Sequence, residues 1–163
     1  MTEFLLAESG IRQLHGRFMD AVWRQDTEDF ADCFAEAGEW KIAGMHMRGR
    51  AEIGEACGRL LGRCEKIQLI IQPALLEVDG ATAQGRVHMI EFAKMLDGSG
   101  TMTIGIYHDR YVEEDGRWRF AWRHWSFKYR GAPDLSAAFI DTPDYGRFPA
   151  MPADDEPTYV RKG

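Results

Sequence analysis

The chain has 163 residues and a formal net charge of −6, a length suited to one domain with a buried core. The acidic balance, without any run of lysines and arginines, disfavours binding to nucleic acid or to an anionic membrane surface. The apolar run before Glu8 consists of Phe4, Leu5 and Leu6, and it is too short for a signal peptide or a membrane span. We therefore expect a cytoplasmic protein.

The cysteines and glycines point to no metal or cofactor. Cys33, Cys57 and Cys64 are odd in number and lie among apolar residues, which predicts reduced, packed thiols. Zinc sites need spacings such as C-x-x-C or H-E-x-x-H, and the sequence has neither. It also lacks a P-loop and a dinucleotide-binding fingerprint. We expect a chain that works without a metal or a cofactor.

Three helical patterns come first. Ser9 is the expected N-cap of the first helix, whose apolar positions recur at helical spacing. Asp26 or Thr27 begins a short second helix that Gly38 is expected to end. A short strand around Trp40 precedes the third helix, which carries a clear apolar stripe. The apolar positions of the third helix are Ile53, Ala56, Cys57, Leu60, Leu61 and Cys64.

The second half of the chain has the period of strands. Asp-Gly pairs, which favour hairpin turns, separate four long segments: 66–78, 81–96, 100–114 and 117–130. Helices followed by a long antiparallel sheet predict an α+β fold, a cone-shaped curved sheet packed against the N-terminal helices around a cavity. We expect this domain to span residues 1–130. Residues 131–163, rich in proline, are expected to form an irregular tail on its surface or at the cavity mouth.

Alternation along the strands selects the residues expected to face the cavity. Glu91 is the one acid among the apolar or small odd positions of 81–96. His108 follows the apolar even positions of 100–114, and His124 and Ser126 follow the aromatic even positions of 117–130. Burial would raise the pKa of Glu91 into a range useful for proton transfer, and a histidine could be its partner.

Structural roles also account for the same residues. A glutamate in a strand commonly lies at the solvent end or in an ion pair, and His108 and His124 could be hydrogen-bonded core or rim histidines. Asp109 and Arg110, near Arg123, predict a cross-strand ion pair. Both interpretations stay open at this point.

Three segments stand out beside the order of the elements: IRQLHGRFMDAVWRQD (11–26), FADCFAEAGEW (30–40) and DRYVEEDGRWRF (109–120). Together they resemble the SnoaL-like branch of the nuclear-transport-factor-2-like superfamily. Relatives include scytalone dehydratase, hexachlorocyclohexane dehydrochlorinase, bile-acid dehydratases and ketosteroid isomerase, as well as non-catalytic subunits of ring-hydroxylating dioxygenases. The resemblance covers about residues 8–130 and implies a cystatin-like α+β barrel with an apolar cavity.

The family's catalytic pattern transfers only in part. Its aspartate, tyrosine and histidine match Trp23, Phe18 and Ile71 here, so the Asp–His pair is absent. Glu91 matches the position of a cavity acid in the bile-acid dehydratases, and Trp40 matches a cavity tryptophan of the dehydrochlorinase.

The resemblance implies a cofactor-independent lyase or isomerase for a small hydrophobic cyclic or aromatic molecule. Glu91 would remove the proton, and His124 or His108 would supply one. The expected binding residues are Phe18, Met19, Val22, Trp23, Trp40, Ile71, Met89, Ile104, Ile106, Trp122 and Ser126. The alternative is a non-catalytic ligand-binding or subunit module whose cavity Trp23 and Trp122 fill. A homodimer or homotrimer through the outer sheet face is expected from the resemblance.

Overall fold

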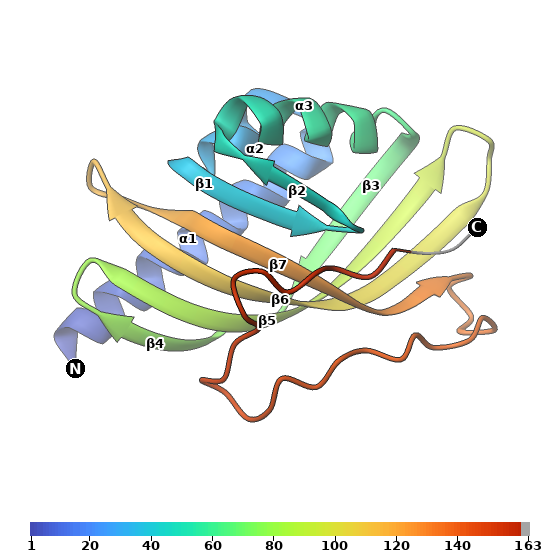
Figure 1. Ribbon diagram of the computed structural model, residues 1–163. Helices are drawn as coiled ribbons and strands as arrows, with labels where there is room; N and C mark the ends of the chain where they lie inside the picture. Colours follow the sequence, from blue (N-terminus) through green and yellow to red (C-terminus); the bar gives the residue numbers. More distant parts are fainter. Residues whose placement is uncertain (161–163) are drawn as a thin grey trace.

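The computed structural model describes residues 1–160; residues 161–163, the end of the predicted tail, lie outside the described part. Three helices and seven strands form within residues 1–160 (Figure 1). The helices are α1 (Thr2–Arg24), α2 (Thr27–Asp32) and α3 (Gly49–Leu61). The strands are β1 (Phe34–Ile42), β2 (Met45–Arg48), β3 (Cys64–Ile71), β4 (Leu75–Asp79), β5 (Thr82–Met95), β6 (Gly100–Glu114) and β7 (Arg117–Gly131).

All the strands belong to one curved sheet, in the order β2-β1-β7-β6-β5-β3, with β4 also paired to β5. β1 runs parallel to β7, and the other pairs are antiparallel. The helices cover one face of this sheet (Figure 1). The predicted α+β class and the packing of a curved sheet against N-terminal helices are therefore confirmed, although the sheet stays open between β2 and β3.

Local chemistry explains where the elements differ from the sequence predictions. The predicted strand 66–78 divides into β3 and β4 around Pro73, which has no backbone N–H to donate to a ladder. The predicted helix end at Gly38 is wrong, because the chain is already extended from Phe34. Gly38 lies at a register shift in β1, where a Cβ would meet the Phe120 carbonyl oxygen at 3.0 Å.

The helix starts follow capping chemistry only in part. Asp26 caps α2 as predicted, with the Asp29 backbone N–H donating to its Oδ1 at 2.9 Å. The first helix instead starts at Thr2, so Ser9 lies inside it rather than at its N-terminus. None of the helices within residues 1–160 is long and apolar enough to cross a membrane.

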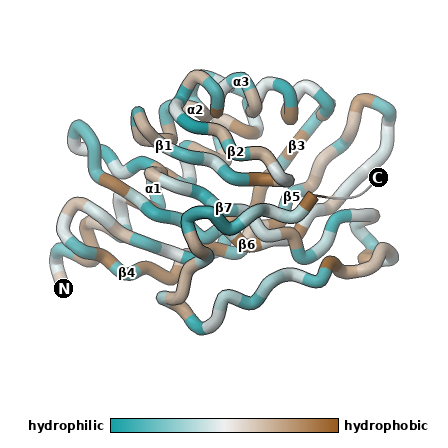
Figure 2. The backbone as a smooth tube through the Cα atoms, viewed as in Figure 1, coloured by the Kyte–Doolittle hydropathy of each residue, from teal (hydrophilic) through white to brown (hydrophobic). Residues whose placement is uncertain are grey.

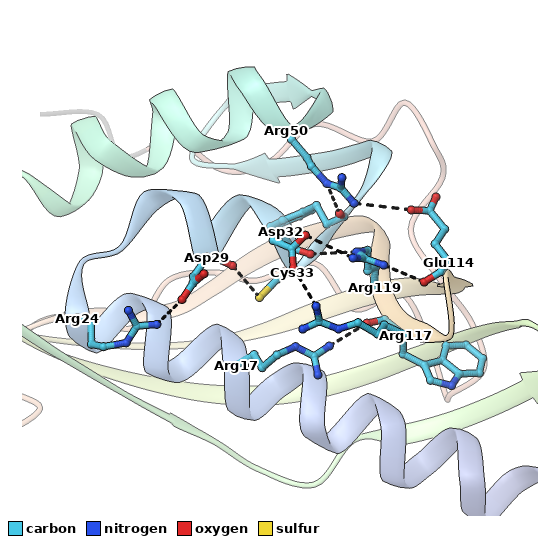
Figure 3. Close-up of polar contacts among 11 residues, drawn as sticks. Arg17, Arg24, Asp29, Asp32, Cys33, Arg50, Glu114, Arg117 and Arg119 are labelled. Atoms are coloured by element: carbon cyan, nitrogen blue, oxygen red, sulfur yellow. Dashed lines mark hydrogen bonds and ion pairs between the residues drawn. The ribbon is translucent and has the colours of Figure 1, made fainter.

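An arginine cluster fastens α2 to the end of the β6–β7 hairpin (Figure 3). Arg119 donates from Nη1 to the Glu114 carbonyl oxygen at 2.8 Å and from Nε to the Asp32 carbonyl oxygen at 3.1 Å. Arg50 reaches this cluster from α3, with its Nη2 3.8 Å from Oε2 of Glu114. These contacts hold the helical layer in a fixed position over the sheet.

Residues 132–160 form no helix or strand and cross the sheet face away from the helices (Figure 1). Along the strands in Figure 2, hydrophilic and hydrophobic residues alternate, as two differently covered faces require. The tail is held by Lys41, which donates to the Asp154 carbonyl oxygen at 3.0 Å, and by Arg86, which donates to that of Gly146 at 2.7 Å. Association through the outer sheet face stays a prediction, and the tail already lies on part of that face.

Candidate functional site

A pocket of about 350 Å³ lies between the helices and the inner face of the sheet. Most of its wall is apolar, formed by all three helices and by β1, β2, β3 and the three longest strands. Its polar side chains are Arg63, Cys64, Glu91, Thr101, Thr103, Tyr107 and Arg130. The volume fits a small organic molecule at the lower end of the usual range for ligand sites.

β5 forms the centre of the pocket wall. Its odd side chains Met89, Glu91, Ala93 and Met95 all line the pocket, as alternation along a strand requires. Glu91 pairs with Leu69 of β3 on one side and with Thr103 of β6 on the other. The carboxyl group is therefore flanked by an aliphatic side chain and a hydroxyl.

Within the part of the chain that the structure describes, Glu91 is the only carboxylate in this wall. Among residues 1–160 it has no hydrogen-bond or ion-pair partner for its side chain. Burial raises the pKa of Glu91 above its usual value, and the positive charge of Arg130 offsets this rise only in part. A carboxyl group with a raised pKa binds a proton more readily, which suits it to accepting a proton and returning it.

Tyr107 supplies a hydrogen-bond donor deeper in the pocket. Its hydroxyl oxygen accepts from Nε1 of Trp40 at 3.1 Å. Burial raises the pKa of Tyr107 to about 12, so the hydroxyl stays protonated at neutral pH. Within the described residues its own hydrogen meets no acceptor, which leaves it free for a ligand oxygen.

A buried network of polar side chains lies next to Tyr107. Arg123 donates to the two carboxylate oxygens of Asp109 at 2.7 and 3.0 Å, and its guanidinium lies 3.6 Å from the Tyr107 ring centroid. Tyr111 donates to Asp109 at 3.0 Å, and His15 Nε2 lies 3.1 Å from the Tyr111 hydroxyl. The predicted ion pair of Asp109 with Arg123 is confirmed.

The prediction that His108 and His124 share a face with Glu91 is wrong. Both lie on the outer face under the tail, where Tyr145 packs against each ring at centroid distances of 5.3 and 6.0 Å. Arg110 is also on that face and pairs with Asp154 of the tail instead of joining the Asp109 pair. Four expected binding residues do not line the pocket and alternate with its inner-facing positions: Ile104, Ile106, Trp122 and Ser126.

In β6 the odd positions Thr103 and Tyr107 face the pocket, so the apolar even positions, with His108, face outward. Two register shifts in β7 explain the error for Trp122, His124 and Ser126. Between the Arg110–Trp122 and Tyr111–Phe120 pairs, Ala121 has no partner, so alternation reverses at that point. Lys128 is a second unpaired residue, between Phe127 and Tyr129, and it reverses alternation again. The inner face therefore receives Arg123, Trp125 and Phe127 and then Arg130, a series that strict alternation does not predict.

The remaining predicted site residues divide into three groups. Phe18, Val22, Trp40 and Met89 line the pocket with Glu91. Met19 and Ile71 instead line a separate cavity of about 290 Å³. Trp23 is 50% exposed, with the Lys66 ammonium 5.9 Å from its ring centroid. Neither Trp23 nor Trp122 lines the pocket, so the alternative in which these two side chains fill the cavity is wrong.

The buried His108 on the outer face makes the stability of the fold depend on pH. Burial, followed by the charges of Arg86, His124 and His88, lowers the pKa of His108 to about 4. In the unfolded chain this histidine titrates near 6.5, so the unfolded state binds the proton first. Stability is therefore complete above about pH 6.5 and falls as the pH drops toward 4. His108 alone should cost roughly 2 kcal/mol between pH 7 and pH 5.

His108→Gln should remove this share of the acid sensitivity, measured as the slope of unfolding free energy against pH. Ser126→Ala is the control, because Ser126 is a buried residue of the same face that carries no titrating group. An unchanged slope in His108→Gln would contradict the assignment.

Comparison with known proteins agrees with this architecture. Residues 3–124 match the family model of the SnoaL-like domain. The chain belongs to the SnoaL-like domain family. No curated protein matches it at a significant level.

Solved structures similar to this SnoaL-like protein include enzymes. A variant of Rv3472, a protein of unknown function from Mycobacterium tuberculosis, has 28% identity and a TM-score of 0.73, covering 84% of this chain and 80% of that one. A provisionally named scytalone dehydratase from Novosphingobium aromaticivorans has 18% identity and a TM-score of 0.76, with coverages of 80% and 91%. Hexachlorocyclohexane dehydrochlorinase LinA-type3 from Novosphingobium barchaimii has 16% identity and a TM-score of 0.72, with coverages of 85% and 97%. At the identities of the last two, the likeness establishes the fold alone.

Proposed function

We propose that this protein is a cofactor-independent lyase or isomerase for a small, mostly apolar, ring-containing molecule. The observation that carries the proposal is a single carboxylate, Glu91, in an otherwise largely apolar pocket of about 350 Å³. The dehydratase and dehydrochlorinase names among the structural neighbours support the same class of reaction.

Glu91 would remove a proton from a carbon next to a carbonyl group. The C–H electron pair then forms an enolate, whose oxygen accepts from the Tyr107 hydroxyl. Reprotonation by Glu91 at another carbon of a conjugated enolate gives an isomer. In an elimination, collapse of the enolate expels the leaving group from the neighbouring carbon with its bonding electron pair, and the leaving group takes the proton that Glu91 holds. The apolar wall excludes water and strengthens both polar interactions.

Tyr107 pairs with Val87, four residues before Glu91 in β5, so the two backbone positions lie about 13 Å apart along the sheet. The oxygen and the neighbouring carbon of one carbonyl group are close together, so both long side chains must extend into the pocket toward the same carbonyl group. Bicyclic and tricyclic ketones have the size that a largely apolar pocket of about 350 Å³ accommodates.

A non-catalytic ligand-binding protein is the second candidate. It is favoured by the absence of a histidine or second carboxylate from the wall around Glu91, as far as residues 1–160 are concerned. The positions that match the family's tyrosine and aspartate, Phe18 and Trp23, hold an apolar wall residue and an exposed tryptophan.

Proton exchange distinguishes these candidates without knowledge of the final product. A panel of bicyclic and tricyclic ketones in D₂O should gain deuterium beside the carbonyl in the presence of the protein, measured by mass spectrometry. Met89→Trp, which fills the pocket beside Glu91, should abolish the exchange, and Leu135→Trp in the exposed tail should not. Ketones that bind but never exchange would support the binding protein instead.

A further inference from the structure

Two arginines line one end of the pocket. Arg63 follows α3, and Arg130 lies near the end of β7; both line the pocket. Arg63 is exposed and Arg130 partly exposed, so this end meets solvent. Their guanidinium groups make no ion pair or hydrogen bond with residues 1–160.

Among residues 1–160, eight of the fourteen arginines pair with carboxylates: Arg24, Arg48, Arg50, Arg59, Arg110, Arg117, Arg119 and Arg123. The chain as a whole is acidic, with a net charge of −6, so carboxylates are not scarce. Two free guanidinium groups at a ligand pocket therefore form a local positive site in an acidic protein.

The backbone places Arg130 in the pocket by a specific irregularity. Because Lys128 is unpaired in the β6–β7 ladder, Arg130 pairs with Thr103 and faces inward. Without that extra residue, its side chain would point to the outer face. Arg130 thus lies on the same side as Glu91, which pairs with Thr103 from the other neighbouring strand.

We infer that the ligand of this pocket is an amphipathic acid, with an apolar ring body and one anionic group. The anionic group, a carboxylate or a sulfonate, would bind Arg63 and Arg130, since planar guanidinium groups bind such oxyanions in a bidentate manner. The ring body would extend past Glu91 toward Tyr107 and Trp40. This inference rests on the proposed function, because it names the ligand class of the same pocket.

Two fluorescent dyes with the same ring system test the inference. 8-Anilinonaphthalene-1-sulfonate carries the anionic group, and N-phenyl-1-naphthylamine lacks it. The sulfonate should bind at least about tenfold more tightly, and added salt should weaken only the sulfonate. Arg63→Gln and Arg130→Gln should each lower the affinity for the sulfonate about tenfold and leave that for the neutral dye within about twofold.

Control variants separate the inference from the proposed reaction. Arg59→Gln removes an arginine of α3 that lies outside the pocket and pairs with Glu55, so it should leave both affinities unchanged. Met89→Trp should abolish binding of both dyes. Glu91→Gln should keep or improve sulfonate binding even though it stops proton exchange. Equal affinities for the two dyes, or sulfonate binding that survives loss of both arginines, would overturn the inference and leave the proposed reaction intact.

Discussion

Glu91→Gln is expected to slow proton exchange at least about 100-fold while the ligand still binds. Glutamine keeps the shape of the side chain and a carbonyl oxygen, but it cannot accept a proton from carbon. The measurement is the rate of deuterium gain by a ketone that the wild-type protein exchanges. Glu113→Gln is the matched control, because Glu113 is an exposed residue of β6 outside the pocket. A variant with the wild-type exchange rate would show that Glu91 is not the base.

The same substitution should change stability in a way that depends on pH. Since burial raises the pKa of folded Glu91, the folded state binds more protons than the unfolded state above the unfolded value of about 4.5. The carboxylate therefore destabilises the fold increasingly as the pH rises from there through the folded pKa. Glu91→Gln should raise the unfolding temperature at pH 8 and change it little at pH 4. The opposite order would mean that Glu91 has a stabilising partner.

The fold could be predicted from the sequence because its strongest signals are local. The 3.6-residue period of α1 and α3, and the Asp-Gly turns after β4, β5 and β6, each specify an element from a few neighbouring residues. Errors arose where an element depends on residues that are distant in the sequence. The start of β1 at Phe34 depends on parallel pairing with Phe120, more than eighty residues later, and no pattern within residues 34–38 shows this.

The site was predicted only in part because both faces of the sheet are covered. Under the tail, outer-face residues such as Trp122 and His124 are as buried as the inner-face Trp125. An aromatic residue in β7 therefore does not indicate which face it occupies, and the unpaired residue at Ala121 reverses the alternation without an obvious signal. Glu91 and Met89 were placed correctly because β5 has no such irregularity where it pairs with β6.

The buried ion pair behind Tyr107 should be the most sensitive point of the fold. Arg123 and Asp109 both have fully buried side chains, and their contact is 2.7 Å at its shortest. Asp109→Asn leaves a buried guanidinium without a countercharge and turns an amide donor toward donor groups. We expect it to cost about 3–5 kcal/mol of unfolding free energy, measured by urea denaturation.

Two comparisons identify the cause of that loss. Glu55→Gln makes the same chemical change in the exposed pair with Arg59, where the side chains are 73% and 59% exposed, and should cost at most about 1 kcal/mol. Asp109→Asn combined with Arg123→Met should be less destabilised than Asp109→Asn alone, because the double variant buries no unpaired charge. A double variant as unstable as the sum of its single variants would assign the cost to lost packing. Arg123 also lies 3.6 Å from the Tyr107 ring centroid, so the ion pair that stabilises the fold is in direct contact with the pocket's hydrogen-bond donor.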